Sequence, residues 1–592
     1  MSDFLPITEK EMIKRGWDYV DVVLVTPDAY VDMPSFAMAI IGRVIENAGF
    51  RVAILSQPDW HNTNDFKRFG RPRLCFAISS GNMDSMINKY THNKKPRSED
   101  DYSEDGKRYN RPDRTTIVFS NIARMAYPDI PIIAGGLEST MRRFAHYDYW
   151  SNTVKRPILL DSRADMLVYG MGEKQIIEIL KRLDKGENIK DIKDIRGTVF
   201  KMGEKEIEKY KSQDDILIIP SYEEVKSDKL KFAIMTEMIF KNINPYSAKA
   251  MLQSSDTRAV IQNPPSFPLS QQELDDIYDL PFNYLPHPIY KKRIPAYETV
   301  KNSITIHRGC YGGCSFCSLS HHQGKFIQSR SIGSVMREIK KLSDNKKNII
   351  ISDIGGPSAN MYFTGGKNFE ICKRCERISC LHPSICSNLN ISSEKLIELM
   401  KEVSNYKNIK KVFVASGIRM DIATAEEKYI KEIAINHTSG YLKVAPEHTQ
   451  KKVLDIMKKP PIETFIEFER IFDNYSKSAG KEQYLITYFI SAFPRTTLDD
   501  AIDMAVFMKK HNLRPLQIND FLPAPSEYAT AIYYTGMDPF TKEKIYVPVL
   551  ESERKMHRAL MQYFKKENIP LIIKALKIAK RTELIKFFLS RR

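Results

Sequence analysis

The amino-acid sequence predicts an α/β fold made of a Rossmann-like parallel sheet, a partial (β/α)6 barrel and a short helical C-terminal extension. Three observations lead to this prediction. Apolar strand runs alternate with amphipathic helix patterns from the N-terminus as far as Tyr169. The alternation resumes at Lys301 and repeats several times. The final segment, residues 551–592, keeps near-helical spacing of its apolar residues.

The N-terminal domain is expected to span residues 1–200. Its predicted strands are residues 21–26, 51–55, 74–78, 131–136 and 165–169. Ser35–Ala48 has the spacing of an amphipathic helix, which Gly49 ends. Strands and helices that alternate in this way favour a parallel sheet with helices on its faces. Residues 201–295 contain strand and helix patterns and then become rich in proline, so we expect a connector there.

The barrel is expected to span residues 296–535. Its predicted strands are residues 303–306, 348–352, 411–415, 441–444, 484–490 and 516–521, with helical patterns between them. Barrels of this kind carry their chemistry at the C-terminal ends of the strands. The remaining residues, 536–592, predict a basic helical extension, which is read as a docking segment in preference to a polyanion-binding face.

Composition narrows the class of protein. The chain has 592 residues, 42% of them hydrophobic, which is enough core for about three or four domains. No run of 18 apolar residues occurs and the N-terminus lacks a signal-peptide pattern, so we expect a cytoplasmic protein without a membrane partner. A net charge of +17 permits a polyanionic partner such as RNA, although solvated lysine accounts for most of it.

Three cysteines form the most specific motif. Cys310, Cys314 and Cys317 have the spacing C-x3-C-x2-C and follow the first predicted barrel strand. Three thiolates on one short loop can hold three corners of a [4Fe-4S] cluster and leave one iron open for a ligand. The alternatives are a structural zinc loop without its fourth ligand, or a chance spacing.

A second group contains Cys372, Cys375, Cys380 and Cys386. Four thiolates match the ligand count of a structural zinc ion or of a second iron–sulfur cluster. His382 could replace one of them. The alternative is four reduced cysteines on a loop inserted after the second barrel strand.

Polar and glycine residues follow two other predicted barrel strands. Gly355 and Gly356 come after the second strand, and Ser416 and Arg419 come after the third. Such groups face a barrel mouth, where they could bind a cofactor. For Arg419, an ion pair with Asp421 or with Glu447 is an equally good interpretation.

The cysteine spacing resembles the signature of radical S-adenosylmethionine (SAM) enzymes. The resemblance implies that SAM chelates the open iron and is reductively cleaved to a 5′-deoxyadenosyl radical. It also implies that Phe316, which precedes the third cysteine, packs near adenine, and that Gly355 and Gly356 present main-chain groups to the methionyl amine. Pro357 stands where the family has an acidic residue. Pro494, in a Phe-Pro turn like that of radical SAM methylthiotransferases, is implied to lie against adenine.

Longer runs identify the chain as a member of the YgiQ family of radical SAM proteins. They include residues 82–86, 135–138, 142–150, 169–173, 263–265, 279–281, 286–288 and 294–297 together with the cysteine segment. Membership implies the fold and the cofactor and leaves the reaction open. The N-terminal sheet resembles a cobalamin-binding domain, but its first loop, Thr26–Phe36, has no histidine, and no GxGxxG occurs. Histidine-ligated cobalamin and a dinucleotide are therefore disfavoured.

The leading functional prediction is a radical SAM enzyme that uses a [4Fe-4S] cluster and SAM on an unknown substrate, with RNA among the candidates. A flavodoxin- or ferredoxin-like donor of low potential is the expected partner. The alternative is a non-catalytic, metal-containing RNA-binding or assembly factor, which would use both cysteine groups structurally and the basic tail for phosphate contacts.

Overall fold

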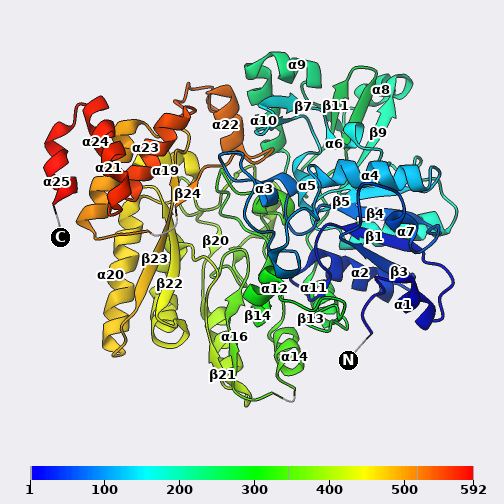
Figure 1. Cartoon of the computed structure of the whole chain (residues 1–592), viewed down its shortest axis with the longest axis horizontal. Coiled ribbons are helices and arrows are strands. Elements are labelled where there is room, and N and C mark those ends of the chain that lie inside the picture. The colour runs from blue at the N-terminus through cyan, green and yellow to red at the C-terminus, as the bar shows by residue number, and fades with distance from the viewer. Residues whose placement is uncertain (1–2, 345, 516–517, 591–592) are drawn as a thin grey trace.

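The computed structural model describes residues 3–344, 346–515 and 518–590. Figure 1 shows the N-terminal sheet and its helices on the right, the barrel elements in the centre and left, and the last helices at the far left. The chain thus passes once across the molecule, from the sheet domain through the barrel to the C-terminal helices.

The N-terminal domain is built on a parallel sheet. Strands β1 (Val22–Thr26), β3 (Val52–Ser56), β4 (Cys75–Ser79), β5 (Ile132–Gly135) and β8 (Met166–Val168) pair in the order β3-β1-β4-β5-β8. Helices α2 (Ala37–Asn47), α4 (Thr115–Ala126) and α7 (Glu173–Asp184) connect and cover them. The strand order reverses between β1 and β4, and doubly wound sheets bind ligands beyond the carboxyl ends of the strands at such a point.

The same sheet extends past residue 200. Strand β9 (Thr198–Gly203) pairs antiparallel with β8, and β12 (Arg258–Gln262), β11 (Ala250–Ser255) and β10 (Ile216–Ile218) follow in that order. Part of the predicted connector, residues 201–295, therefore belongs to the sheet. The pairs β8–β9, β9–β12 and β12–β11 are antiparallel, whereas β10 and β11 are parallel. Strand and helix patterns predict the elements of this segment, but they do not show that its strands pair with the N-terminal sheet.

The barrel is open and consists of parallel strands. Strand β14 (Ser303–Thr305) pairs with β18 (Asp353–Gly355), and β17 (Ile349–Ile351) pairs with β21 (Ile409–Val412). A bridge between Ile418 and Val444 leads on to β22 (Tyr441–Glu447), β23 (Tyr484–Ser491) and β24 (Asn519–Asp520). Helices α14 (Ile332–Ser343), α16 (Glu394–Ser404), α20 (Ile462–Ser478) and α21 (Leu498–Lys510) lie between the strands in sequence. Of the last predicted strand, residues 516–517 lie outside the described residues.

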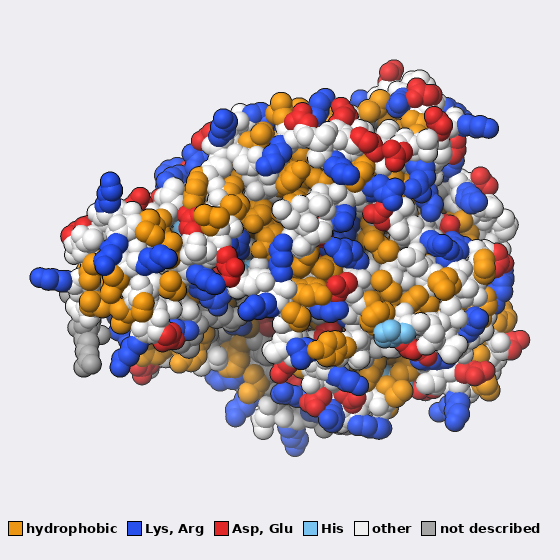
Figure 2. Space-filling model, turned by 45° about the horizontal axis from the view of Figure 1, so that its top comes forward, with side chains coloured by type: hydrophobic (Ala, Val, Ile, Leu, Met, Phe, Trp, Pro, Cys, Tyr) orange, Lys and Arg blue, Asp and Glu red, His pale blue; other side chains and the backbone are white. Residues whose placement is uncertain are grey.

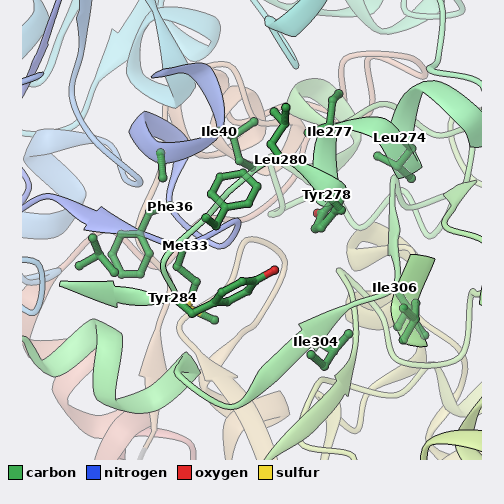
Figure 3. Packing of buried hydrophobic residues seen from close by; sticks show 14 of the residues in the cluster. Met33, Phe36, Ile40, Leu274, Ile277, Tyr278, Leu280, Tyr284, Ile304 and Ile306 are labelled. Carbon is green, nitrogen blue, oxygen red and sulfur yellow. The ribbon is translucent and has the colours of Figure 1, made fainter. Parts of the chain in front are cut away.

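One hydrophobic core continues from the sheet domain into the barrel. Figure 3 shows Met33 and Phe36 from the N-terminal domain packing near Tyr284, with Ile304 of β14 on the barrel side. Helix α11 (Gln271–Asp279) contributes further buried side chains to this cluster. Because buried side chains of both parts share this cluster, the N-terminal sheet is held against the barrel.

The C-terminal extension packs as helices. Helices α23 (Glu551–Met561) and α24 (Ile569–Ile578) bury Leu560, Ala575 and Leu576 against α21. Figure 2 shows Lys and Arg side chains spread over the visible face among acidic and apolar ones. Among the described residues, no helix combines the length and the apolar character that crossing a membrane requires.

Candidate metal and cofactor site

The loop that carries Cys310, Cys314 and Cys317 begins directly after β15 (His307–Arg308), which pairs antiparallel with β16 (Gln328–Ser329). Two glycines fix its path. Gly309 has φ +89°, and a side chain there would overlap the carbonyl oxygen of Phe326. Gly313 has φ +61°, and a Cβ atom would lie 2.6 Å from the carbonyl oxygen of Ile378. Glycine alone meets both demands at no steric cost.

The three thiols of this loop are free and half-buried, and they influence one another. Burial raises the pKa of Cys310 to about 11, and the thiol of Cys314 adds to the effect. Burial also raises the pKa of Cys317, with contributions from Glu527 and Cys314. A metal bound here would replace the thiol protons, because thiolates are the ligands.

Arg419 lies against this group of thiols. Its Nη1 donates to Sγ of Cys314 at 3.3 Å, and its Nη2 is 2.5 Å from Asp421 Oδ2. Asn360 holds the arginine from behind, since its side-chain amide donates to the Arg419 carbonyl at 2.9 Å and accepts from its N–H at 2.9 Å. Of the two alternative ion pairs, the one with Asp421 is present, whereas Glu447 lies 3.7 Å from Lys459.

Gly355, Gly356 and Ser416 line one cavity of about 460 Å³. A Cβ atom on Gly355 would lie 2.8 Å from Ser416 Oγ, and one on Gly356 would lie 2.6 Å from His307 Cε1. A side chain at either position would displace these neighbours. The opposite wall of the cavity comes from the N-terminal domain and includes Asn82.

Phe316, within the cysteine loop, packs next to the Phe-Pro turn that contains Pro494. The rings of Phe316 and Phe493 meet edge to face with their centroids 6.0 Å apart. Pro494 follows Phe493 and is buried. Neither Phe316 nor Pro494 lines the 460 Å³ cavity. The predicted cofactor residues thus fall into those that line this cavity and those that do not.

Two further charged residues, Glu527 and Lys458, interact with the first cysteine group although no sequence motif predicts it. Burial raises the pKa of Glu527, a residue 3% exposed, well above its ordinary value. Glu527 in turn raises the pKa of Cys317, which lies 210 positions earlier in the chain. Burial lowers the pKa of Lys458, and Cys314 is among the groups that oppose this shift. No local motif links any of these pairs.

The second cysteine group lies on the segment between β18 and α16. Its four thiols are free and partly exposed. The imidazole of His382 takes another direction, because its Nε2 lies 3.7 Å from Asp455 Oδ1. His382 is therefore placed as a partner of Asp455 and not as a substitute for one of the thiols.

Comparison with known proteins gives three family matches. Residues 4–303 match the model "Radical SAM N-terminal", and residues 304–508 match "Radical SAM superfamily". Residues 516–588 match a domain of unknown function, DUF3362.

Solved structures of lower similarity include two radical SAM enzymes. OxsB, described as a cobalamin-dependent SAM radical enzyme, has a TM-score of 0.48 at 9% identity, covering 96% of this chain and 76% of that one. The methyltransferase TsrM from Kitasatospora setae, with cobalamin and a [4Fe-4S] cluster bound, has a TM-score of 0.47 at 12% identity, covering 94% and 99%.

Relatives in sequence are much closer. The chain is 48% identical to a UPF0313 protein of Methanocella arvoryzae over 98% of its own length and 96% of that protein. It is 42% identical to the UPF0313 protein YgiQ of Escherichia coli K12, covering 99% of this chain and 87% of that one. Identities of this size over nearly the whole length establish that the chain belongs to the UPF0313 (YgiQ) family of radical SAM proteins.

Proposed function

We propose that the protein is an enzyme that binds a [4Fe-4S] cluster on Cys310, Cys314 and Cys317 and uses it to cleave SAM. The observation that carries the proposal is the loop itself, in which three free thiols influence one another on a backbone fixed by Gly309 and Gly313. Three cysteines are one ligand short of a closed cluster, so one iron stays open. Membership of the radical SAM superfamily supports SAM as its ligand.

The surrounding residues fit this cofactor pair. Gly355 and Gly356 leave their main chain bare beside Ser416, as contact with a methionyl group requires. The guanidinium of Arg419 offers its positive charge to the thiolate of Cys314. Phe316 and Pro494 would supply an apolar surface for adenine. With Pro357 in place of an acidic residue, the methionyl amine would depend on main-chain carbonyls.

When bound, the cluster and SAM would supply a one-electron cleavage of the sulfonium C5′–S bond, giving methionine and a 5′-deoxyadenosyl radical that removes a hydrogen atom. The chain's own part is to hold the ligands, exclude water and keep the substrate near. The electron would come from a flavodoxin- or ferredoxin-like donor of low potential. The substrate would lie in the 460 Å³ cavity, whose walls come from both domains.

The alternative of a non-catalytic RNA-binding or assembly factor has less in its favour. Its main support in the sequence is the net charge of +17. On the face seen in Figure 2, the cationic side chains are interspersed with acidic ones and form no single stripe. The basic C-terminal helices bury their apolar side chains against α21, as docking helices do.

The test is the formation of 5′-deoxyadenosine. The protein would be purified without oxygen, reconstituted with iron and sulfide, and given dithionite and SAM. We expect 5′-deoxyadenosine from the wild type and none from Cys314→Ala, because this variant has lost one of the three thiolates. Cys75→Ala is the matched control, since Cys75 is fully buried in β4.

Cleavage of SAM by Cys314→Ala at the wild-type rate would contradict the assignment. So would a reconstituted wild-type protein whose cluster spectrum does not respond to SAM. Normal cleavage by Cys75→Ala is required for the loss in Cys314→Ala to be assigned to the cluster.

A further inference from the structure

The segment that carries the second cysteine group is a closed excursion. A short hairpin of β19 (Gly365–Gly366) and β20 (Leu389–Asn390) joins its two ends. Between them, helix α15 (Phe369–Lys373) carries Cys372, and Cys375 follows one turn later, with its N–H donating to the Cys372 carbonyl at 3.2 Å. The N–H of Cys386 donates to the Cys380 carbonyl at 2.8 Å. All four cysteines are thus brought back to one place.

Gly366 and Asn388 both contact the Cys372 sulfur atom or leave space for it. A side chain on Gly366 would overlap this sulfur atom. The sulfur occupies the space that glycine leaves empty. The side-chain amide of Asn388 donates to Cys372 Sγ at 3.3 Å. Hydrogen bonds to an ionised acceptor are stronger than those to a neutral one, so this donor favours a thiolate over a thiol.

A buried lysine adds positive charge to the same place. Lys325 is 9% exposed, and within the described part of the chain it forms no ion pair with a carboxylate. Its Nζ donates to the carbonyls of Cys375 and Arg377 at 3.2 and 3.0 Å. Burial of a charge is costly unless an opposite charge compensates it. Thiolates beside Lys325 would provide that compensation.

The thiols are also near enough to influence one another. Burial raises the pKa of Cys380 to about 11, Lys325 opposes the shift, and Cys375, Cys386 and Cys372 add to it. Burial and Cys375 raise the pKa of Cys372 in the same way. Four free thiols therefore share one small region with one cation.

The arrangement favours a cluster over a single ion. Among the described residues, no three His, Cys, Asp or Glu side chains are arranged to hold one metal ion, and this applies to both cysteine groups. A zinc ion needs each sulfur about 2.3 Å from the same centre. In a [4Fe-4S] cluster each thiolate binds a different iron, so the sulfur atoms stand further apart.

We propose that Cys372, Cys375, Cys380 and Cys386 hold a second [4Fe-4S] cluster. Unlike the first group, this one supplies a thiolate for every iron, so the cluster has no open position for SAM. The assignment does not depend on SAM cleavage by the first group.

The second site is tied directly to the loop of the first. The N–H of Cys380 donates to the carbonyl of Tyr311 at 3.0 Å, and the hydroxyl of Ser379 donates to the carbonyl of Gly312 at 2.7 Å. Tyr311 and Gly312 lie between Cys310 and Cys314 in the chain. A rigid second cluster would therefore brace the loop that carries the first.

The experiment counts iron and sulfide in anaerobically reconstituted full-length variants, with Mössbauer and EPR spectra of each. The wild type should hold about eight irons per chain. A variant with Cys310, Cys314 and Cys317 all changed to Ala should keep about four, with a [4Fe-4S] spectrum that SAM does not alter. The Cys372→Ser/Cys375→Ser variant should also keep about four, with an EPR signal that SAM does alter.

Gly366→Ala gives a second approach that leaves every thiol in place. It should reduce iron uptake at the second group because its methyl group occupies the space of the Cys372 sulfur. Gly365→Ala is the neighbouring control, because a Cβ atom there meets nothing within 4 Å although φ is +151°.

An iron-free triple-alanine variant that is otherwise folded by circular dichroism would overturn the proposal. Zinc at about one per chain in that variant would overturn it as well, in favour of a structural zinc site. The proposal would also be overturned if the wild type bound only about four irons and the Cys372→Ser/Cys375→Ser variant bound the same number. Failure of SAM cleavage with about eight irons bound would count against the proposed function and leave the second cluster standing.

Discussion

Arg419 and Asp421 form a buried ion pair beside the cysteine loop. Their side chains are 7% and 10% exposed, and the arginine also donates to Cys314. Burial acts to lower the pKa of Arg419, but Asp421 and the thiols of Cys314 and Cys310 together raise it above its ordinary value. The guanidinium therefore stays charged where a cluster of thiolates would need a cation.

Removing one member of this pair should cost more than removing both. Arg419→Gln leaves the carboxylate of Asp421 buried without its partner and should lower the free energy of unfolding by about 3–5 kcal/mol. The double variant Arg419→Gln/Asp421→Asn should recover part of that loss, because neither charge remains. Urea unfolding of the unreconstituted proteins measures both values. Equal losses in the single and double variants would contradict the ion-pair account.

His448 makes the free energy of unfolding depend on pH, and one substitution tests this contribution. The residue is 1% exposed, burial lowers its pKa to about 3, and Nδ1 accepts the N–H of Gln450 at 3.0 Å. The unfolded chain binds a proton at this residue below pH of about 6.5, whereas the folded chain does not, so stability falls as pH decreases from 6.5 toward 3. Asp500 favours the proton, and His557 and Lys452 oppose it.

His448→Gln should therefore become more stable relative to the wild type as the pH falls. Between pH 7 and pH 5 the difference in unfolding free energy should move by about 2 kcal/mol in favour of the variant. Urea unfolding at both pH values measures the change. If the difference in unfolding free energy were the same at both pH values, His448 would bind a proton equally well in the folded and unfolded protein.

At the scale of elements, the cysteine loop depends on contact with the inserted segment. Gly313 lies against Ile378 and Ser379, whereas Gly324, at the end of the same loop, has φ +82° and nothing within 4 Å of its Cβ position. The two glycines share the left-handed backbone and differ in their surroundings.

Alanine at these two positions should separate backbone cost from contact. Gly324→Ala should lower the free energy of unfolding by about 1–2 kcal/mol, the cost of the left-handed conformation. Gly313→Ala should lower it further and also reduce iron uptake by Cys310, Cys314 and Cys317, because the methyl group pushes the inserted segment away. Iron analysis and urea unfolding provide the measurements. Equal behaviour of the two variants would show that the loop does not rely on this contact.

At the scale of the whole molecule, a buried ion pair joins the two domains. Glu173, at the start of α7, lies 2.5 Å from Arg308 of β15, and their side chains are 4% and 3% exposed. Arg308 comes two residues before Cys310, so the N-terminal domain reaches the base of the cysteine loop. The neighbouring residue, Lys174, forms an exposed pair with Glu273 at 2.6 Å.

Glu173→Gln should leave Arg308 buried without its counter-charge and lower the free energy of unfolding by about 3–5 kcal/mol. Lys174→Gln is the adjacent control and should change it by less than about 1 kcal/mol, because exposed pairs contribute little. Thermal unfolding followed by circular dichroism compares the two variants. If Glu173→Gln lost no more stability than Lys174→Gln, the Glu173–Arg308 pair would not stabilise the contact between the domains.

Several features could be predicted from the sequence because they are local. The parallel half of the N-terminal sheet and the barrel strands have apolar runs at strand length with amphipathic helices between them, and this period is a property of neighbouring residues. The fold class and the family were predicted correctly on this basis. The cysteine spacing is equally local, since three thiols on one loop need no other part of the chain to bring them together.

The tertiary structure decided the features that join distant segments. Strands β9 to β12 extend the N-terminal sheet through three antiparallel pairs and one parallel pair, and no local pattern predicts which strands pair. Arg419 reaches Cys314 across 105 positions, and Lys325 reaches Cys375 across 50. These contacts depend on how helices and sheets pack and on which buried charges find partners. Local patterns therefore predict the elements and the thiol motif, whereas packing sets the surroundings of each thiol.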